Sequence, residues 1–180
     1  MLNPFTRIAG WQALGLGLLF FVLTVYVGSI SGVVFDGVLD VHFVEQSLTY
    51  SFMVAGISLV CLVLVMWIIG LLVAKRFRFL DLLGTLILSR APYLIMAVGG
   101  FFIQFPDLSA IIENPNILFQ NVSFYIMMIL SLPVMVWNIT LTYQAFRISC
   151  DLKGRTLTIA LIAGLFFSEA LSKIIIFLIQ

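Results

Sequence analysis

Charged side chains are scarce in this sequence. Asp, Glu, Lys and Arg together make up only 9% of its 180 residues, whereas hydrophobic residues make up 63%. A soluble domain carries about a quarter charged residues, and so few charges could not cover the surface of a soluble monomer. The composition therefore predicts that lipid is the solvent for most of the chain.

Several functional classes are excluded by what the sequence lacks. Histidine occurs once, at His42, so a site that needs several histidines is excluded. The two cysteines, Cys61 and Cys150, lack the spacing of a metal site or a disulfide framework. There is no basic stripe for nucleic acid, and no HExxH, P-loop or GxSxG motif. We therefore expect a non-enzymatic protein without catalytic residues, cofactor, metal or nucleic-acid partner.

Long apolar runs predict five membrane-spanning helices. A spanning helix needs about 20 mostly apolar residues, because the bilayer core is about 30 Å thick and each residue rises about 1.5 Å. The runs that meet or approach this length cover residues 11–30, 50–74, 84–105, 124–146 and 157–179. The predicted fold is all-α, with a single membrane domain over residues 1–180 built as a five-helix bundle.

The third run contains Pro92, with Arg90 two residues before it. One interpretation is a single kinked helix whose Arg90 side chain extends to the cytoplasmic headgroups. The other is an interfacial helix over residues 79–90, followed by a segment from Pro92 that is too short, at about 21 Å, to cross alone. We favour the kinked helix and expect a bend near Pro92.

Basic residues alternate with the predicted spans. Eight of the nine lysines and arginines, Arg90 included, precede the first span or follow the second or the fourth. The connections over residues 31–49 and 106–123 contain none, and they carry Asp36, Asp40, Glu45, Asp107 and Glu113. The positive-inside rule then predicts a multi-pass membrane protein with a cytoplasmic N-terminus and an outside C-terminus. Apolar residues among these acids predict short segments that lie on the outer headgroups.

Glu169 is the main anomaly of the sequence. It lies about 18 Å into the fifth span, where a charge costs on the order of 2.5–3.5 kcal/mol. Lys173 follows at i+4, a spacing that lets the two side chains pair on one helix face. The functional interpretation is an ion or proton site, and Arg90 belongs to the same set of intramembrane polar candidates. The structural interpretation is a Glu169–Lys173 pair, or a neutral Glu169 bonded to a neighbour such as Asn138.

Small residues at helix-packing spacing occur in two spans. They are Gly28 and Gly32 near the end of the first span, and Ala160, Gly164, Ser168 and Ser172 along the fifth. Small residues four apart let helix backbones approach closely. Packing within the chain is the simpler interpretation, and a dimer face is the alternative.

Two short motifs resemble a known family. They are Leu2-Asn3-Pro4-Phe5 before the first span, and Asp81-Leu82-Leu83-Gly84-Thr85 through Ser89-Arg90-Ala91-Pro92 at the third. With the five predicted spans, the chain resembles the bacterial branch of the Yip (Ypt/Rab-interacting protein) family of membrane proteins. The resemblance implies a five-helix bundle without known catalysis, located in the bacterial inner membrane. Eukaryotic members work with small GTPases through a longer cytoplasmic N-terminal region, but only about ten residues precede the first span here, which argues against a GTPase partner.

Two functions follow as expectations. The first is a scaffold, assembly, trafficking or envelope protein whose partners are the lipid bilayer and a second copy of the chain or other membrane proteins. The alternative is a small transporter or channel subunit with Glu169 and Lys173 on its pathway. A pathway requires polar residues from several spans to converge inside the bundle, whereas a scaffold would have a dry, packed centre.

Overall fold

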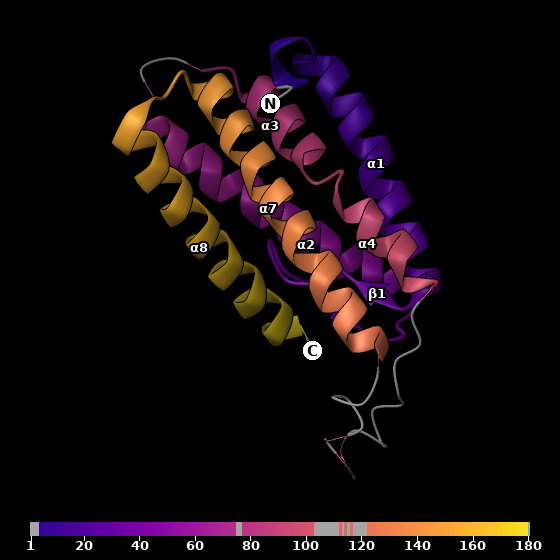
Figure 1. The fold of residues 1–180 in the computed structure, drawn as a ribbon. Coiled ribbons are helices and arrows are strands. Elements are labelled where there is room, and N and C mark those ends of the chain that lie inside the picture. Colours follow the sequence, from indigo (N-terminus) through magenta and orange to yellow (C-terminus); the bar gives the residue numbers. More distant parts are fainter. Residues whose placement is uncertain are drawn as a thin grey trace.

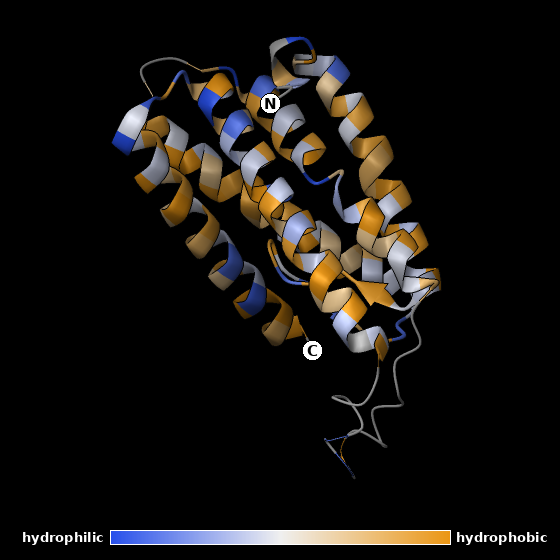
Figure 2. Ribbon diagram, in the orientation of Figure 1, coloured by the Kyte–Doolittle hydropathy of each residue, from blue (hydrophilic) through white to orange (hydrophobic). Residues whose placement is uncertain are grey.

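The computed structural model describes residues 4–74, 77–102, 112, 114, 116 and 122–179. Among these residues, five helical segments are long and apolar enough to cross a membrane, and the fold is all-α apart from one short ribbon. Hydrophobic residues predominate along these segments (Figure 2). The elements are η1 (Pro4–Thr6), α1 (Gly10–Ser31), β1 (Val33–Val34), β2 (His42–Phe43), α2 (Leu48–Val73), α3 (Phe79–Ser89), α4 (Tyr93–Gly100), α7 (Val122–Cys150) and α8 (Gly154–Ile179).

The long helices lie side by side and alternate in direction (Figure 1). Helix α3 packs on α1 and α7, and α8 packs on α2. One end of the bundle, which we call the basic end, carries Arg7, Arg78, Arg147, Lys153 and Arg155. The opposite end carries the connection between α1 and α2, with Asp36, Asp40 and Glu45, and we call it the acidic end.

The third apolar run is broken rather than smoothly kinked. Helix α3 ends at Ser89 and α4 begins at Tyr93, so Arg90 to Pro92 form a turn between them. The break falls where proline was expected to disturb the helix, because proline removes an amide donor and clashes with the preceding turn. Helix α3 is not interfacial, since Leu82 and the residues from Gly84 to Ser89 are buried. The last residues assigned to this run, 103–105, lie outside the described residues, as do Asp107 and Glu113.

The expected position of Arg90 is wrong. Its side chain is only 5% exposed and donates to a carbonyl of the α1–α2 connection, at 3.0 Å from Gly37. It therefore points into the bundle toward the acidic end and does not extend to headgroups at the basic end.

The α1–α2 connection folds into the bundle. Gly32 ends α1 in a left-handed conformation with φ 72°, which glycine adopts without a steric cost. Val33 and Val34 then pair with Phe43 and His42 as an antiparallel ribbon. The apolar residues Val33, Val34, Phe35 and Val38 are 1–3% exposed. Most of the apolar residues of this connection are therefore buried in the bundle and unavailable to headgroups, whereas Val44 is exposed. We call the tip of the connection, residues 36–42, the inward loop.

Gly28 and Gly32 serve this reversal of the chain rather than a helix–helix contact. A Cβ at Gly28 would lie 2.6 Å from the carbonyl oxygen of Val33, so only glycine lets the returning strand approach α1. Gly32 is the left-handed cap described above. On α8, by contrast, Ala160, Gly164, Ser168 and Ser172 are all buried, and Gly164 contacts Met66 of α2.

The closest helix pair uses two glycines that the sequence analysis did not select. A Cβ at Gly84 of α3 would lie 2.8 Å from the carbonyl oxygen of Gly10 and from the backbone nitrogen of Leu14, both in α1. A Cβ at Gly17 of α1 would lie 2.8 Å from the backbone nitrogen of Leu88. The two helices therefore pack backbone against backbone, as small residues allow.

Hydroxyl groups join α3 to α7. Thr85 and Ser149 approach to 3.0 Å between their side-chain oxygens, and Ser89 and Thr142 to 3.1 Å. Asn138, on the same face of α7 as Thr142, is 2% exposed. These bonds fix the rotation of α3, and with it the direction in which Arg90 leaves the helix.

Candidate functional site: buried charges around the inward loop

Arg90 is placed by the break between α3 and α4. It follows the last residue of α3, where the carboxyl end of a helix favours a cation. Its Nη2 donates to the carbonyl of Gly37, and its guanidinium carbon lies 5.1 Å from the ring centre of Tyr93. A cation over an aromatic face is attracted by the ring quadrupole, so Tyr93 helps to hold the guanidinium.

Tyr93, the first residue of α4, contacts the same loop. Its hydroxyl donates to the carbonyl of Val38 at 3.0 Å, and its ring packs on Phe35 at 5.4 Å between centroids. Helix α4 is itself tied to α1 by a hydrogen bond from the Ser31 hydroxyl to the carbonyl of Ala97. The phenol therefore reaches the inward loop from a fixed helix.

Glu169 approaches the inward loop from α8. Its Oε2 accepts hydrogen bonds from the backbone amides of Val38 at 2.6 Å and Leu39 at 2.9 Å. Successive amides that point at one anion form a concave site for negative charge. Gly37 is required beside it, because a Cβ there would collide with Oε1 of Glu169.

Two consecutive peptide groups are therefore clamped between hydrogen-bond donors on one side and the carboxylate of Glu169 on the other. The peptide that joins Gly37 to Val38 offers its carbonyl to Arg90 and its amide to Glu169. The next peptide offers its carbonyl to Tyr93 and its amide to Glu169. In each case the negative end of the peptide dipole meets a donor and the positive end meets the carboxylate. The clamp pairs the buried Arg90 and the partly buried Glu169 with backbone, as burial of a charge requires.

Lys173 lies one turn beyond Glu169 and binds the acids of the loop. Its Nζ lies 2.8 Å from Asp40 and 3.2 Å from Asp36. Among the described residues, no ion pair joins Lys173 to Glu169, so the expected i, i+4 pair does not form. Both side chains turn to the inward loop instead, and α8 holds this loop at two successive turns.

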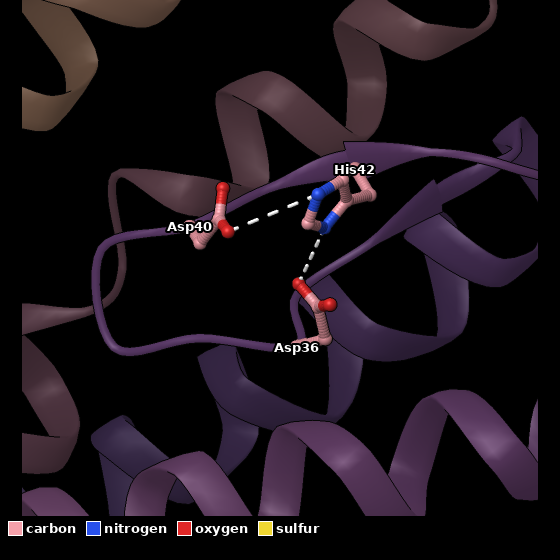
Figure 3. Close-up of side chains that lie close together, drawn as sticks. All are labelled: Asp36, Asp40 and His42. Atoms are coloured by element: carbon pink, nitrogen blue, oxygen red, sulfur yellow. Dashed lines mark hydrogen bonds and ion pairs between the residues drawn. The ribbon is translucent and has the colours of Figure 1, made fainter. Parts of the chain in front are cut away.

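The His42 ring lies between the same two carboxylates (Figure 3). Its Nδ1 is 2.8 Å from Asp36 and its Nε2 is 3.8 Å from Asp40. The ligand atoms of Asp36, Asp40 and His42 lie within 4.8 Å of one another, close enough to share a metal ion. The ammonium of Lys173 already bonds both carboxylates, however, so a metal would have to displace it. The cluster acts chemically as an ion-paired latch.

The electrostatics of Asp40 agree with this latch. Partial burial raises the pKa of Asp40, but the hydrogen bond from Lys173 and the nearby charges of His42 and Lys173 outweigh it. The pKa of Asp40 therefore lies below its ordinary value, and the carboxylate keeps its charge at neutral pH.

A small cavity opens beside Arg90. It lies between α1, α2, α4 and the start of the α1–α2 connection. The residues that line it are Phe21, Thr24, Val25, Phe35, Ala55, Arg90 and Tyr93. Nη1 of Arg90 and the hydroxyl of Thr24 are buried and have no hydrogen-bond partner among the described residues. The cavity thus combines an apolar wall with two unused donors.

The structure brings together three of the four polar candidates. Arg90, Glu169 and Lys173 all contact the inward loop. Asn138 is buried on α7 with its Nδ2 unpaired, and no bond to Glu169 exists among the described residues. The roles of Gly37, Tyr93 and Thr24 at this site were not predicted from the sequence. A glycine between Asp36 and Asp40 was nevertheless a signal that another part of the chain approaches the backbone there.

The chain was compared with family models, curated proteins and solved structures. No family model, no curated protein and no solved structure matches the chain.

Proposed function

We propose that this chain is a non-enzymatic, multi-pass membrane protein that acts as a small ion transporter or channel, with the inward loop as its gate. The observation that carries the proposal is the clamp of Arg90 and Glu169 on the Gly37–Val38 peptide. Ionisable residues within membrane helices are costly and lean toward function. A passive scaffold would need no such contacts between charged side chains of the spans and a loop.

The arrangement of backbone supports the same proposal. Broken helices and irregular backbone inside a membrane bundle are tolerated where they line a site or a pathway. Here a three-residue break in α3–α4 lies against a loop that enters the bundle from the acidic end. We infer that the loop closes the pathway on the outer side, with the basic end in the cytoplasm.

The resemblance to the Yip family supports five spans without catalysis, and it does not indicate which ion would be transported. A small GTPase remains an unfavoured partner for the reason given above. The bacterial inner membrane is the proposed location, and the lipid bilayer is the partner of the exposed apolar faces.

Ion flux through proteoliposomes tests the proposal. Gly37→Ala adds a methyl group that would contact Glu169 and lie 2.6 Å from Cβ of Asp40, so it should loosen the inward loop and raise flux several-fold. Gly56→Ala on α2 is the matched control, since nothing lies within 4 Å of the added Cβ. Chloride efflux is followed with an electrode and proton flux with an enclosed pH dye.

Flux above protein-free liposomes, and higher in Gly37→Ala than in wild type and Gly56→Ala, would support the proposal. Absence of both chloride and proton flux in all three proteins would overturn the transport function. Equal flux in all three proteins would contradict the proposal that the inward loop is the gate.

A further inference from the structure

We propose that the cavity beside Arg90 is a binding site for a small monovalent anion of the size of chloride. The inference deepens the proposed function, on which it rests for its biological meaning, because it names the ion. Arg90 is 5% exposed, and within the described part of the chain its guanidinium makes one hydrogen bond, from Nη2 to the carbonyl of Gly37.

The charge of Arg90 is not cancelled by direct contact with an acid. Glu169, the nearest clamp partner, is bonded to the amides of Val38 and Leu39. Among the described residues, no ion pair includes Arg90. A buried charge that lacks a counter-charge in contact is costly, and an anion in the adjoining cavity would remove that cost.

The cavity has the donors and the walls that such an anion requires. Nη1 of Arg90 and the hydroxyl of Thr24 have no partner in the part of the chain that the structure describes, and both residues line the cavity. The remaining lining residues are apolar or aromatic, namely Phe21, Val25, Phe35, Ala55 and Tyr93. Among the described residues, no carboxylate lines the cavity, and Glu169 acts on Arg90 only across the peptide that both residues bind.

Size limits the class of ligand. The cavity has room for roughly one water-sized particle, so among anions only a monatomic ion approaches its size, and phosphate, sulfate and lipid headgroups are too large. A single water bonded to Arg90 and Thr24 is the competing occupant. A halide differs from water in that the cationic guanidinium would bind it as a charge-assisted partner.

Chloride binding to the purified full chain distinguishes the two occupants. The ³⁵Cl resonance broadens when chloride exchanges with a protein site, and bromide should reverse the broadening. Thr24→Val keeps the shape of the side chain and removes its hydroxyl, so it should weaken chloride binding about tenfold. Ser51→Ala is the matched control, because the Ser51 hydroxyl is also buried and unpaired but does not line the cavity.

Broadening that bromide reverses and that Thr24→Val weakens, with Ser51→Ala like wild type, is the expected result. No reversible broadening in wild type would mean that water alone fills the cavity and would overturn the inference. Equal broadening in wild type and Thr24→Val would place chloride elsewhere and overturn it as well. Binding without flux would leave this site standing and refute the transport function, whereas flux without binding would do the reverse.

Discussion

Glu169 shows how one side chain can organise a distant part of the chain. Its carboxylate accepts hydrogen bonds from two backbone amides that lie 130 and 131 residues earlier in the sequence. Hydrogen bonds to a charged group are roughly twice as strong as those between neutral groups. The role of Glu169 in the structure is therefore to hold the inward loop, and its size and acceptor oxygens matter as much as its charge.

Two substitutions of Glu169 separate these properties. Glu169→Gln keeps a carbonyl oxygen that can accept from Val38 and Leu39, so it should lower the thermal midpoint in detergent only slightly. Glu169→Leu leaves two amides without an acceptor, at a cost of about 1–3 kcal/mol each, and should lower both the midpoint and the folded yield. Differential scanning fluorimetry and size-exclusion profiles measure the two effects.

The exposed acid Glu45 provides the matched control, since it lies in the same connection and Glu45→Gln should behave as wild type. If Glu169→Leu unfolds at the wild-type temperature, the carboxylate does not hold the loop.

Among the helices, the α1–α3 pair has the tightest packing. The added Cβ of Gly84→Ala would meet backbone atoms of Gly10 and Leu14, which cannot rotate away as a side chain can. Overpacking of this kind costs about 1–3 kcal/mol. Gly84→Ala should therefore reduce thermal stability and folded yield.

Gly15→Ala in α1 is the control for the glycine-to-alanine change itself. Nothing lies within 4 Å of its added Cβ, and alanine favours a helix over glycine by about 1 kcal/mol. Gly15→Ala should be neutral or slightly stabilising. A Gly84→Ala protein as stable as Gly15→Ala would contradict close contact between the two helices.

Hydropathy alone predicted the long helices, because each apolar run is a local property of the sequence. A disturbance near Pro92 was predicted because proline acts on its own helix, but the structure has a break over Arg90 to Pro92 in place of the expected kink. The inward loop could not be predicted, because acids mixed with valines suit a surface connection equally well. Lys173 at i+4 from Glu169 suited a pair, and only the tertiary fold placed Asp36 and Asp40 within its reach.

At the scale of the whole molecule, the two ends of the bundle differ in charge. The proposed orientation places the basic end in the cytoplasm, following the positive-inside rule. Single cysteines at Glu45 and Lys153, both exposed, test it in a background with Cys61 and Cys150 changed to Ala. An impermeant maleimide added to intact cells should label the cysteine at position 45 and leave that at 153 unlabelled until the cells are opened. The opposite labelling pattern would show that the basic end faces outward and would contradict the proposed orientation.

The clamp also has a consequence for the order of assembly. Synthesis proceeds at about 5–20 residues per second, so α8 emerges on the order of 10 s after the inward loop that it binds. During that interval Asp36 and Asp40 have no Lys173, and the amides of Val38 and Leu39 have no Glu169. Arg90 and Tyr93 can bind the loop carbonyls before then, but the loop amides and acids gain their partners only when α8 inserts and completes the clamp.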